Sequence, residues 1–133
     1  MEGRILPEQL NCTLSTEPDR RTVLWIRGEV DVATAEQFRS AVLHTARHGK
    51  RMVYDVEGAM FLDASGLRVL RALAQEARRL HHPAPVLRGM RPLLARSLKA
   101  TGLLDAFAQE PATPFTLTRA QIGRRAAVPA PSA

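Results

Sequence analysis

The sequence predicts an α/β protein built on a mostly parallel sheet. Strand-like and helix-like segments alternate along the chain, which is the pattern of helices packed against a parallel sheet. The apolar run Val23-Leu24-Trp25-Ile26 is typical of a central strand buried on both faces. A third observation is the amphipathic segment from Leu67 to Leu80, which predicts a helix with one buried side. With 133 residues, the chain fits one domain with its own hydrophobic core.

The segments before residue 50 predict two strands and a helix. Alternating apolar and polar residues predict a strand over Leu10 to Thr16, and the central apolar run predicts another over Thr22 to Arg27. Thr34 and Gln37 have the spacing of a capping box at the start of a helix. Gly49 is a suitable residue to end that helix.

The stretch from Tyr54 to Leu80 is the part around which the chain is organised. Its first half has the apolar residues of a strand, interrupted at Gly58. Its second half has leucine and alanine at three- and four-residue spacing, with arginines on the other side. Between them stand Asp63 and Ser65, both common N-cap types. The Ser65 hydroxyl is therefore predicted at a strand-to-helix turn, at the positive end of a helix dipole.

Three interpretations of this turn are open from the residues alone. Asp63 or Ser65 caps the helix and does nothing more, or Ser65 is a nucleophile, or Ser65 is a site of regulatory phosphorylation. A nucleophile elbow has the pattern G-x-S-x-G, but Asp63 and Leu67 occupy its glycine positions. A hydrolase would also need a base, for which the chain offers four histidines: His44, His48, His81 and His82.

The remaining segments predict one more strand and helix. The connection from His81 to Pro85 is stiff, and a strand is predicted over Val86 to Arg88. Pro92 suits the first position of a helix that ends at Gly102. After Phe107 the composition shifts toward Pro and Ala.

The chain is accordingly divided into a folded unit over residues 1–110 and a Pro/Ala-rich C-terminal tail over 111–133. Thr118 and Gln121 have capping-box spacing, so a short helix over 118–125 is one expectation for the tail. Disorder is expected from about Ala127 onward.

Composition excludes several classes of function. The single cysteine, Cys12, predicts neither a disulfide framework nor a cysteine-based metal site. The net charge of +6 raises the question of nucleic acid, but the basic residues are scattered and no nucleic-acid-binding signature is present. The chain has no signal peptide and no membrane-spanning run, so a cytoplasmic protein is expected, with no membrane and no nucleic acid among its partners.

The block from Val53 to Leu67 closely resembles the central motif of STAS domains, in particular the bacterial anti-anti-sigma factors, also called anti-sigma factor antagonists. In that family an Asp-Ser-Ser-Gly-Leu motif opens the second helix, and its second serine is the phosphate acceptor. The resemblance makes Ser65 the acceptor and Asp63 the motif aspartate, followed by Gly66 and Leu67. The chain departs from the motif at Ala64, where the first serine often stands.

Two flanking segments add to the resemblance. Gly28-Glu29-Val30-Asp31 resembles the Gly-Glu-Leu-Asp segment that closes the family's second strand, and the family places the matching aspartate, Asp31, near the acceptor serine. Thr101-Gly102-Leu103 matches a typical helix end. The resemblance covers about Leu10 to Phe107. It implies a STAS-like α/β fold, with a mixed sheet of four or five strands and helices packed mainly on one face.

The function implied by the resemblance is that of an anti-sigma factor antagonist. When unphosphorylated, such a protein binds a serine-kinase anti-sigma factor and frees a sigma factor. The kinase switches it off by phosphorylating Ser65, and a phosphatase restores it. The chain is then not an enzyme and needs no cofactor or metal. The predicted partner-binding residues surround the acceptor: Asp31, Asp63, Ala64, Ser65, Gly66, Leu67 and Arg68. The alternative is a STAS scaffold, or a transport-complex subunit, that binds another protein partner.

Overall fold

The structure is a computed structural model that describes residues 9–48, 51–113 and 126–127. The elements follow one another as β1 (Leu10–Thr16), β2 (Thr22–Val30), α1 (Ala35–His48), β3 (Met52–Asp55), β4 (Ala59–Leu62), α2 (Ala64–Arg79), β5 (Val86–Arg88), α3 (Pro92–Ala100), the 3-10 helix η1 (Leu104–Ala106), β6 (Ala108–Glu110) and β7 (Ala126–Ala127). The predicted α/β class is confirmed.

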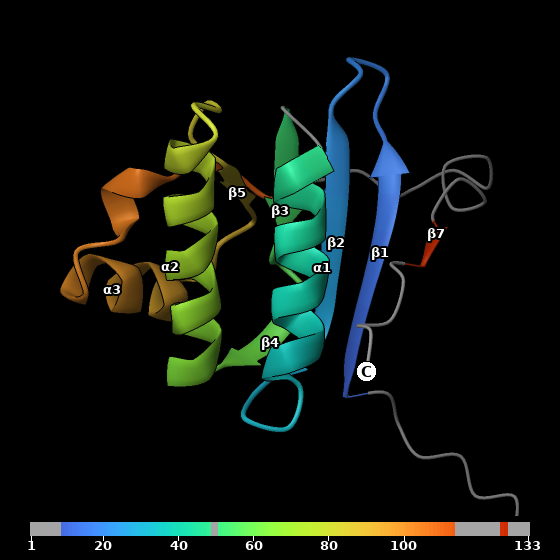
Figure 1. Cartoon of the computed structure of the whole chain (residues 1–133). Coiled ribbons are helices and arrows are strands. Elements are labelled where there is room, and N and C mark those ends of the chain that lie inside the picture. Colours follow the sequence, from blue (N-terminus) through green and yellow to red (C-terminus); the bar gives the residue numbers. More distant parts are fainter. Residues whose placement is uncertain (1–8, 49–50, 114–125, 128–133) are drawn as a thin grey trace, which may run out of the picture.

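The sheet is mixed, as predicted, and helices α1 and α2 lie side by side on one of its faces (Figure 1). Its strand order is β6-β5-β3-β2-β1-β7, with β4 paired to β2 beside this path. β1 runs antiparallel to β2 and to β7, whereas the other pairs are parallel. α3 lies beyond α2, toward the β5 and β6 side.

Within the described residues the sheet has seven strands, which is more than the four or five expected. The strand predicted on both sides of Gly58 is two strands, because a turn at Glu57 and Gly58 separates the end of β3 at Asp55 from the start of β4 at Ala59. β2 pairs with β3 through Thr22 to Trp25 and with β4 through Gly28 to Val30, and the register shifts between Gly28 and Glu29, within the β4 pairing. β6 and β7 are too short to stand out as apolar runs.

The hydrophobic core lies between the sheet and the two long helices. The predicted apolar side of α2 and the apolar side of α1 are buried there, each large side chain contributing about 1.5–3 kcal/mol. The main contributors come from both layers: Leu24, Ile26, Phe38, Val42, Tyr54, Leu70, Leu73 and Leu87.

The opposite face of the sheet carries a buried ion pair. Successive side chains of a strand point to opposite faces, so Asp55 and Arg88 point away from the helices that Tyr54 and Leu87 face. Arg88 Nε donates to Asp55 Oδ2 at 2.9 Å, and these side chains are only 4% and 5% exposed. Arg88 Nη1 also donates to Glu17 Oε2 at 2.9 Å. This network ties β3 and β5 to the β1–β2 hairpin.

The capping box predicted at the start of α1 is wrong. The Gln37 side chain donates to the carbonyl of Leu10 in β1, and not to the backbone of Thr34. The Thr34 N–H donates to Asp31, and the Thr34 hydroxyl donates to the carbonyl of Glu29. These partners lie at the end of β2 and in β1, and the local spacing of Thr34 and Gln37 carries no information about them.

Part of the expected C-terminal tail is in the sheet. Ala126 and Ala127 form β7 and pair with Leu14 and Thr13 of β1. Ala127, where disorder was expected to begin, is therefore the last residue of a strand. The short helix expected over 118–125 lies outside the described residues.

Candidate functional site

The first turn of α2 holds the predicted acceptor serine. Asp63 is the N-cap, and its Oδ1 accepts the N–H groups of Ser65 and Gly66 at 2.9 and 3.3 Å. The same oxygen accepts the Ser65 hydroxyl at 2.5 Å. The hydroxyl, followed by the N–H of Gly66 and that of Ser65, holds the pKa of Asp63 below its usual value. One carboxylate oxygen therefore both caps the helix and orients the serine hydroxyl.

The parallel pairing of β2 and β4 places Asp31 at the same edge. Val30 is the register partner of Leu62, and the N–H of Asp63 donates to the carbonyl of Val30 at 3.1 Å. Asp31, the next residue after Val30, is thereby brought beside the α2 start. Its carboxylate accepts the N–H groups of Ala33 and Thr34, so it shapes the β2–α1 loop instead of bonding to Ser65.

Gly66 fits tightly beneath the site. A Cβ at this position would lie 2.6 Å from Leu62 Cγ and 2.9 Å from Val30 Cγ1, both closer than atoms pack. The missing side chain lets α2 begin directly on the ends of β2 and β4. Ser65 and Leu67 are half-buried, whereas Ala64 and Arg68 are exposed. Of the predicted partner-binding residues, Ala64 and Arg68 therefore lie on the surface, and Gly66 is buried beneath it.

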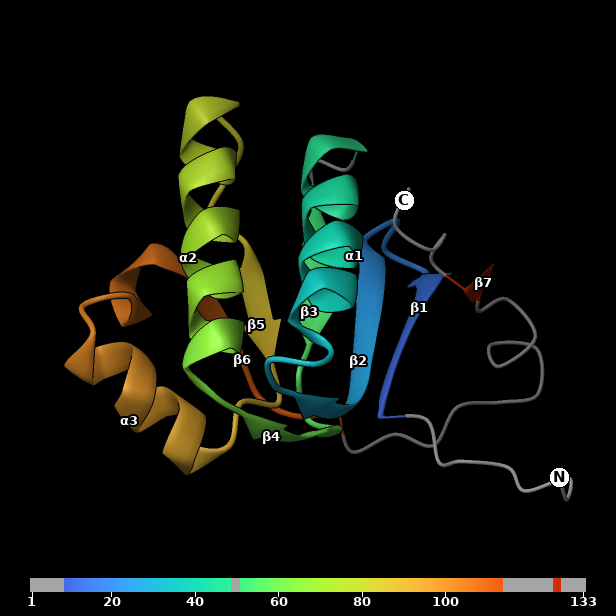
Figure 2. The ribbon, with the colours of Figure 1, turned by 60° about the horizontal axis from the view of Figure 1, so that its bottom comes forward.

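Four exposed apolar side chains lie at the same end of the molecule, and sequence reasoning missed them as a group. They are called the apolar rim here: Val32 (82% exposed), Met60 (66%), Phe61 (51%) and Leu93 (68%). Figure 2 shows the elements that carry them, namely the loop before α1, β4 and the start of α3, around the start of α2. Arg91, beside Leu93, connects α3 to β4, since its guanidinium lies 3.3 Å from the Met60 sulfur.

Met60 and Phe61 were missed because their sequence context is that of a buried strand. Four apolar residues in succession, Ala59 to Leu62, predict burial on both faces. In the structure β4 lies beside the main strand path and pairs with β2. Ala59 is buried and Met60 and Phe61 are exposed. Exposed apolar side chains that gather in one place mark binding sites for other proteins.

The four histidines lie away from Ser65. His44 and His48 are exposed on α1, with ring centroids 4.6 Å apart. His81 and His82 follow the C-terminal end of α2, whose N-terminal end carries Ser65. The serine hydroxyl donates to Asp63. None of these four histidines is therefore placed to act as a base for Ser65.

In the part of the chain that the structure describes, no three His, Cys, Asp or Glu side chains are grouped to hold a metal ion. No helix in the same part combines the length and the apolar character that a membrane crossing requires.

The family follows from the match to a protein-family model. The model described as the STAS domain matches residues 13–121, a range that includes the ends of β2 and β4 and the turn at Ser65. The chain belongs to the STAS family. A search of curated protein sequences found no significant match.

Solved structures agree with this STAS fold. An anti-sigma factor antagonist from Mycobacterium paratuberculosis is 22% identical, with a TM-score of 0.66 over 80% of this chain and 90% of that one. The phosphorylated form of SpoIIAA from Bacillus is 19% identical, with a TM-score of 0.60 over 77% of this chain and 92% of the SpoIIAA chain. A chain of the stressosome, described as a signal integration and transduction hub, is 27% identical. Its TM-score is 0.55 over 74% of this chain and 87% of the stressosome chain.

Proposed function

We propose that this STAS protein is an anti-sigma factor antagonist whose binding is switched off by phosphorylation of Ser65. The unmodified chain binds a serine-kinase anti-sigma factor and so frees the sigma factor that this partner holds. The observation that carries the proposal is the half-buried Ser65 hydroxyl at the start of α2, in a STAS chain, beside the apolar rim. A phosphatase returns the chain to its binding state.

The chemistry of the site suits a protein partner that must also reach a hydroxyl. Met60, Phe61 and Leu93 offer exposed apolar surface that a protein partner can bury. Ser65 presents its hydroxyl at the same end of the molecule, at the start of α2, with the proton held by Asp63. The remaining lone pairs of Ser65 Oγ are then available for attack on a phosphoryl group. A bound kinase that carries ATP would supply that group.

Phosphorylation changes this surface more than the fold. The phosphate replaces the hydroxyl proton, so the bond from Ser65 Oγ to Asp63 is lost. It adds about −1.5 to −2 charge at neutral pH, which the α2 N-terminus tolerates and Asp63 repels. These opposing effects keep the folding free energy nearly constant. The interface, in contrast, gains a bulky dianion where it fitted a neutral hydroxyl. The existence of SpoIIAA in a phosphorylated form with a related fold supports this switch.

A second candidate is a STAS module within a larger signalling assembly. The fold similarity to a stressosome chain, at 27% identity, favours it over a transport-complex subunit. In that case the same surface holds copies or relatives of the chain together. The two candidates differ in their partner, since an assembly partner forms a lasting complex and transfers no phosphate.

The proposed function is tested by capture and transfer with the full chain. The unmodified chain and Ser65→Asp are used as baits in a lysate of the source organism, and retained proteins are identified by mass spectrometry. The proposal expects a serine kinase with the unmodified bait and much less of it with Ser65→Asp. The purified kinase and ATP should then add one phosphate, mapped to Ser65. Ser97→Ala, on α3, is the matched control and should still be phosphorylated. Retention of only non-kinase partners by both baits would favour the assembly candidate.

A further inference from the structure

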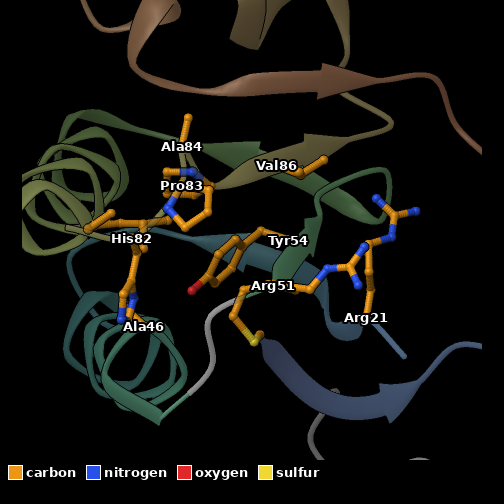
Figure 3. Close-up of a pocket in the computed structure, with 12 residues that line it drawn as sticks. Arg21, Ala46, Arg51, Tyr54, His82, Pro83, Ala84 and Val86 are labelled. Atoms are coloured by element: carbon orange, nitrogen blue, oxygen red, sulfur yellow. The ribbon is translucent and has the colours of Figure 1, made fainter. Parts of the chain in front are cut away.

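A pocket of about 220 Å³ opens near the end of α2 that is farthest from Ser65. Leu73 and Ala77 line it, and at 1.5 Å per residue Ala77 lies about 18 Å along the helix from Ser65. The C-terminal half of α1 and the first residues of β3 and β5 complete its walls (Figure 3). The proposed anti-sigma function uses none of these residues.

The interior of the pocket is apolar. Met52, Tyr54, Leu73 and Ala77 form its inner walls, and the stiff connection before β5 closes one side with Pro83 and Pro85. Figure 3 places the Tyr54 ring between His82 and Pro83 on one side and Arg51 and Arg21 on the other. An apolar ligand body can therefore lie against an aromatic ring and aliphatic side chains.

The Tyr54 phenol on the inner wall has its proton already bound. The Thr45 hydroxyl donates to the carbonyl of Val42 at 2.8 Å, so Tyr54 is the donor in its 3.1 Å bond with Thr45. Burial raises the pKa of Tyr54 to about 12, so the phenol stays protonated. The phenol thus offers no free donor to an anion. The arginines at the mouth are the charged groups that face the negative end of a ligand.

The mouth carries two arginines with different roles. Arg21 is committed to carboxylates, because it pairs with Glu110 and with Asp19. Arg51 is exposed, and its side chain has no hydrogen bond or ion pair among the described residues. The pKa of Asp19 is lowered, mainly by the hydrogen bond from the backbone N–H of Arg21. The positive charge of Arg51 is the smallest of the causes. Arg51 is therefore the guanidinium available to a ligand.

We propose that this pocket binds a small carboxylate whose apolar body is about the size of one aromatic ring. An apolar cavity of about 150 Å³ holds benzene, so 220 Å³ admits a ring with a short chain. Drug-sized ligands need about 300 Å³ or more, so the pocket selects small molecules. The ring lies against Tyr54 and Leu73, and the chain directs the carboxylate to Arg51 at the mouth.

The test is a titration of the isotopically labelled full chain followed by NMR. The probes are 3-phenylpropionate, 3-phenylpropan-1-ol and 3-phenylpropylamine, which differ only in the polar end. The proposal expects saturable shifts at the amides of Met52, Tyr54 and Ala77, with the carboxylate bound about fivefold more tightly than the alcohol, as for one exposed ion pair. The amine should bind more weakly than the alcohol.

Two variants with matched controls locate the ligand. Arg51→Gln should remove the preference for the carboxylate, whereas Arg96→Gln on α3 should keep it. Ala84→Trp places a large side chain on the exposed mouth and should abolish binding, whereas Ala100→Trp should not. Equal affinity for all three probes would overturn the carboxylate assignment, and absence of shifts at Met52 and Tyr54 would overturn the site. Neither outcome bears on Ser65, because the pocket and the serine are tested separately.

Discussion

The Ser65 hydroxyl donates to the same Asp63 oxygen that caps helix α2. The position of the proposed phosphate acceptor and the start of the helix are thereby fixed by one atom. A change at either residue affects both the local stability of α2 and the presentation of the hydroxyl.

Asp63→Ala should lower the melting temperature by a few degrees, because it removes the cap from two N–H groups of α2. Asp63→Asn should keep most of the stability, since an asparagine oxygen still caps a helix. The two variants are compared by thermal denaturation followed by circular dichroism. Similar melting temperatures for the alanine variant and the parent would show that Asp63 does not stabilise the helix start.

Gly66→Ala should destabilise the fold by about 1–3 kcal/mol, because its Cβ would overlap Leu62 and Val30. Gly58→Ala is the control, because the nearest atom to its Cβ is Arg27 Cγ in a flexible exposed side chain, and it should cost less. Urea denaturation gives both free energies of unfolding. If Gly66→Ala were as stable as the parent, the close packing of α2 on the ends of β2 and β4 would be contradicted.

Arg88→Met should destabilise the fold by about 3–5 kcal/mol, because it leaves the buried carboxylate of Asp55 without its partner. Replacing both residues, as Arg88→Met with Asp55→Leu, should recover much of this loss, since no buried charge then remains unpaired. Urea denaturation of the parent, the single variant and the double variant measures the coupling. If the double variant were less stable than Arg88→Met alone, the loss in the single variant would not come from an unpaired Asp55 carboxylate.

Stability should fall between pH 4.5 and about 2 through Glu76. Hydrogen bonds from Arg79, and then from Arg47, lower its pKa from 4.5 to about 2. A carboxylate with a depressed folded-state pKa stabilises the fold above its unfolded pKa, and this contribution disappears as the pH falls toward the folded value. Glu76→Gln should therefore show a shallower decline of melting temperature over this interval.

Salt provides the check on this pH dependence. Arg47 and Arg79 are 56% and 64% exposed, so added salt should screen their pairs with Glu76 and reduce the difference between parent and Glu76→Gln. A difference that persists unchanged in high salt would point to a cause other than these ion pairs.

The order of the elements could be predicted from the sequence because local patterns determine it. The strand from Leu10 to Thr16 and the helix start at Pro92 have the predicted bounds, since alternation and proline chemistry act within a few residues. A cap at Asp63 or Ser65 also followed from their place before the apolar periodicity, and the structure assigns the cap to Asp63. Contacts between distant segments did not follow, such as Gln37 with Leu10 or Arg88 with Asp55.

The candidate site was predictable to a similar extent. Ser65, Asp63 and Gly66 stand in a motif, so a resemblance identified them. The apolar rim did not stand out, because Met60 and Phe61 are exposed only as a result of the placement of β4 beside β2. A pattern of apolar residues shows that they can be buried, and the tertiary structure decides whether they are.

A phosphate on Ser65 is proposed to act at the interface and to leave the fold intact. The direct measurement is the affinity of the captured kinase for three full-length forms, unmodified, Ser65→Ala and Ser65-phosphorylated, by isothermal titration calorimetry beside their melting curves. The first two forms should bind, and the phosphorylated chain should bind at least about 100-fold more weakly, the loss typical of one disrupted interface hot spot. Its melting temperature should stay close to that of the unmodified chain. Equal binding of all three forms, or a phosphorylated chain in which α2 is unfolded, would contradict the mechanism.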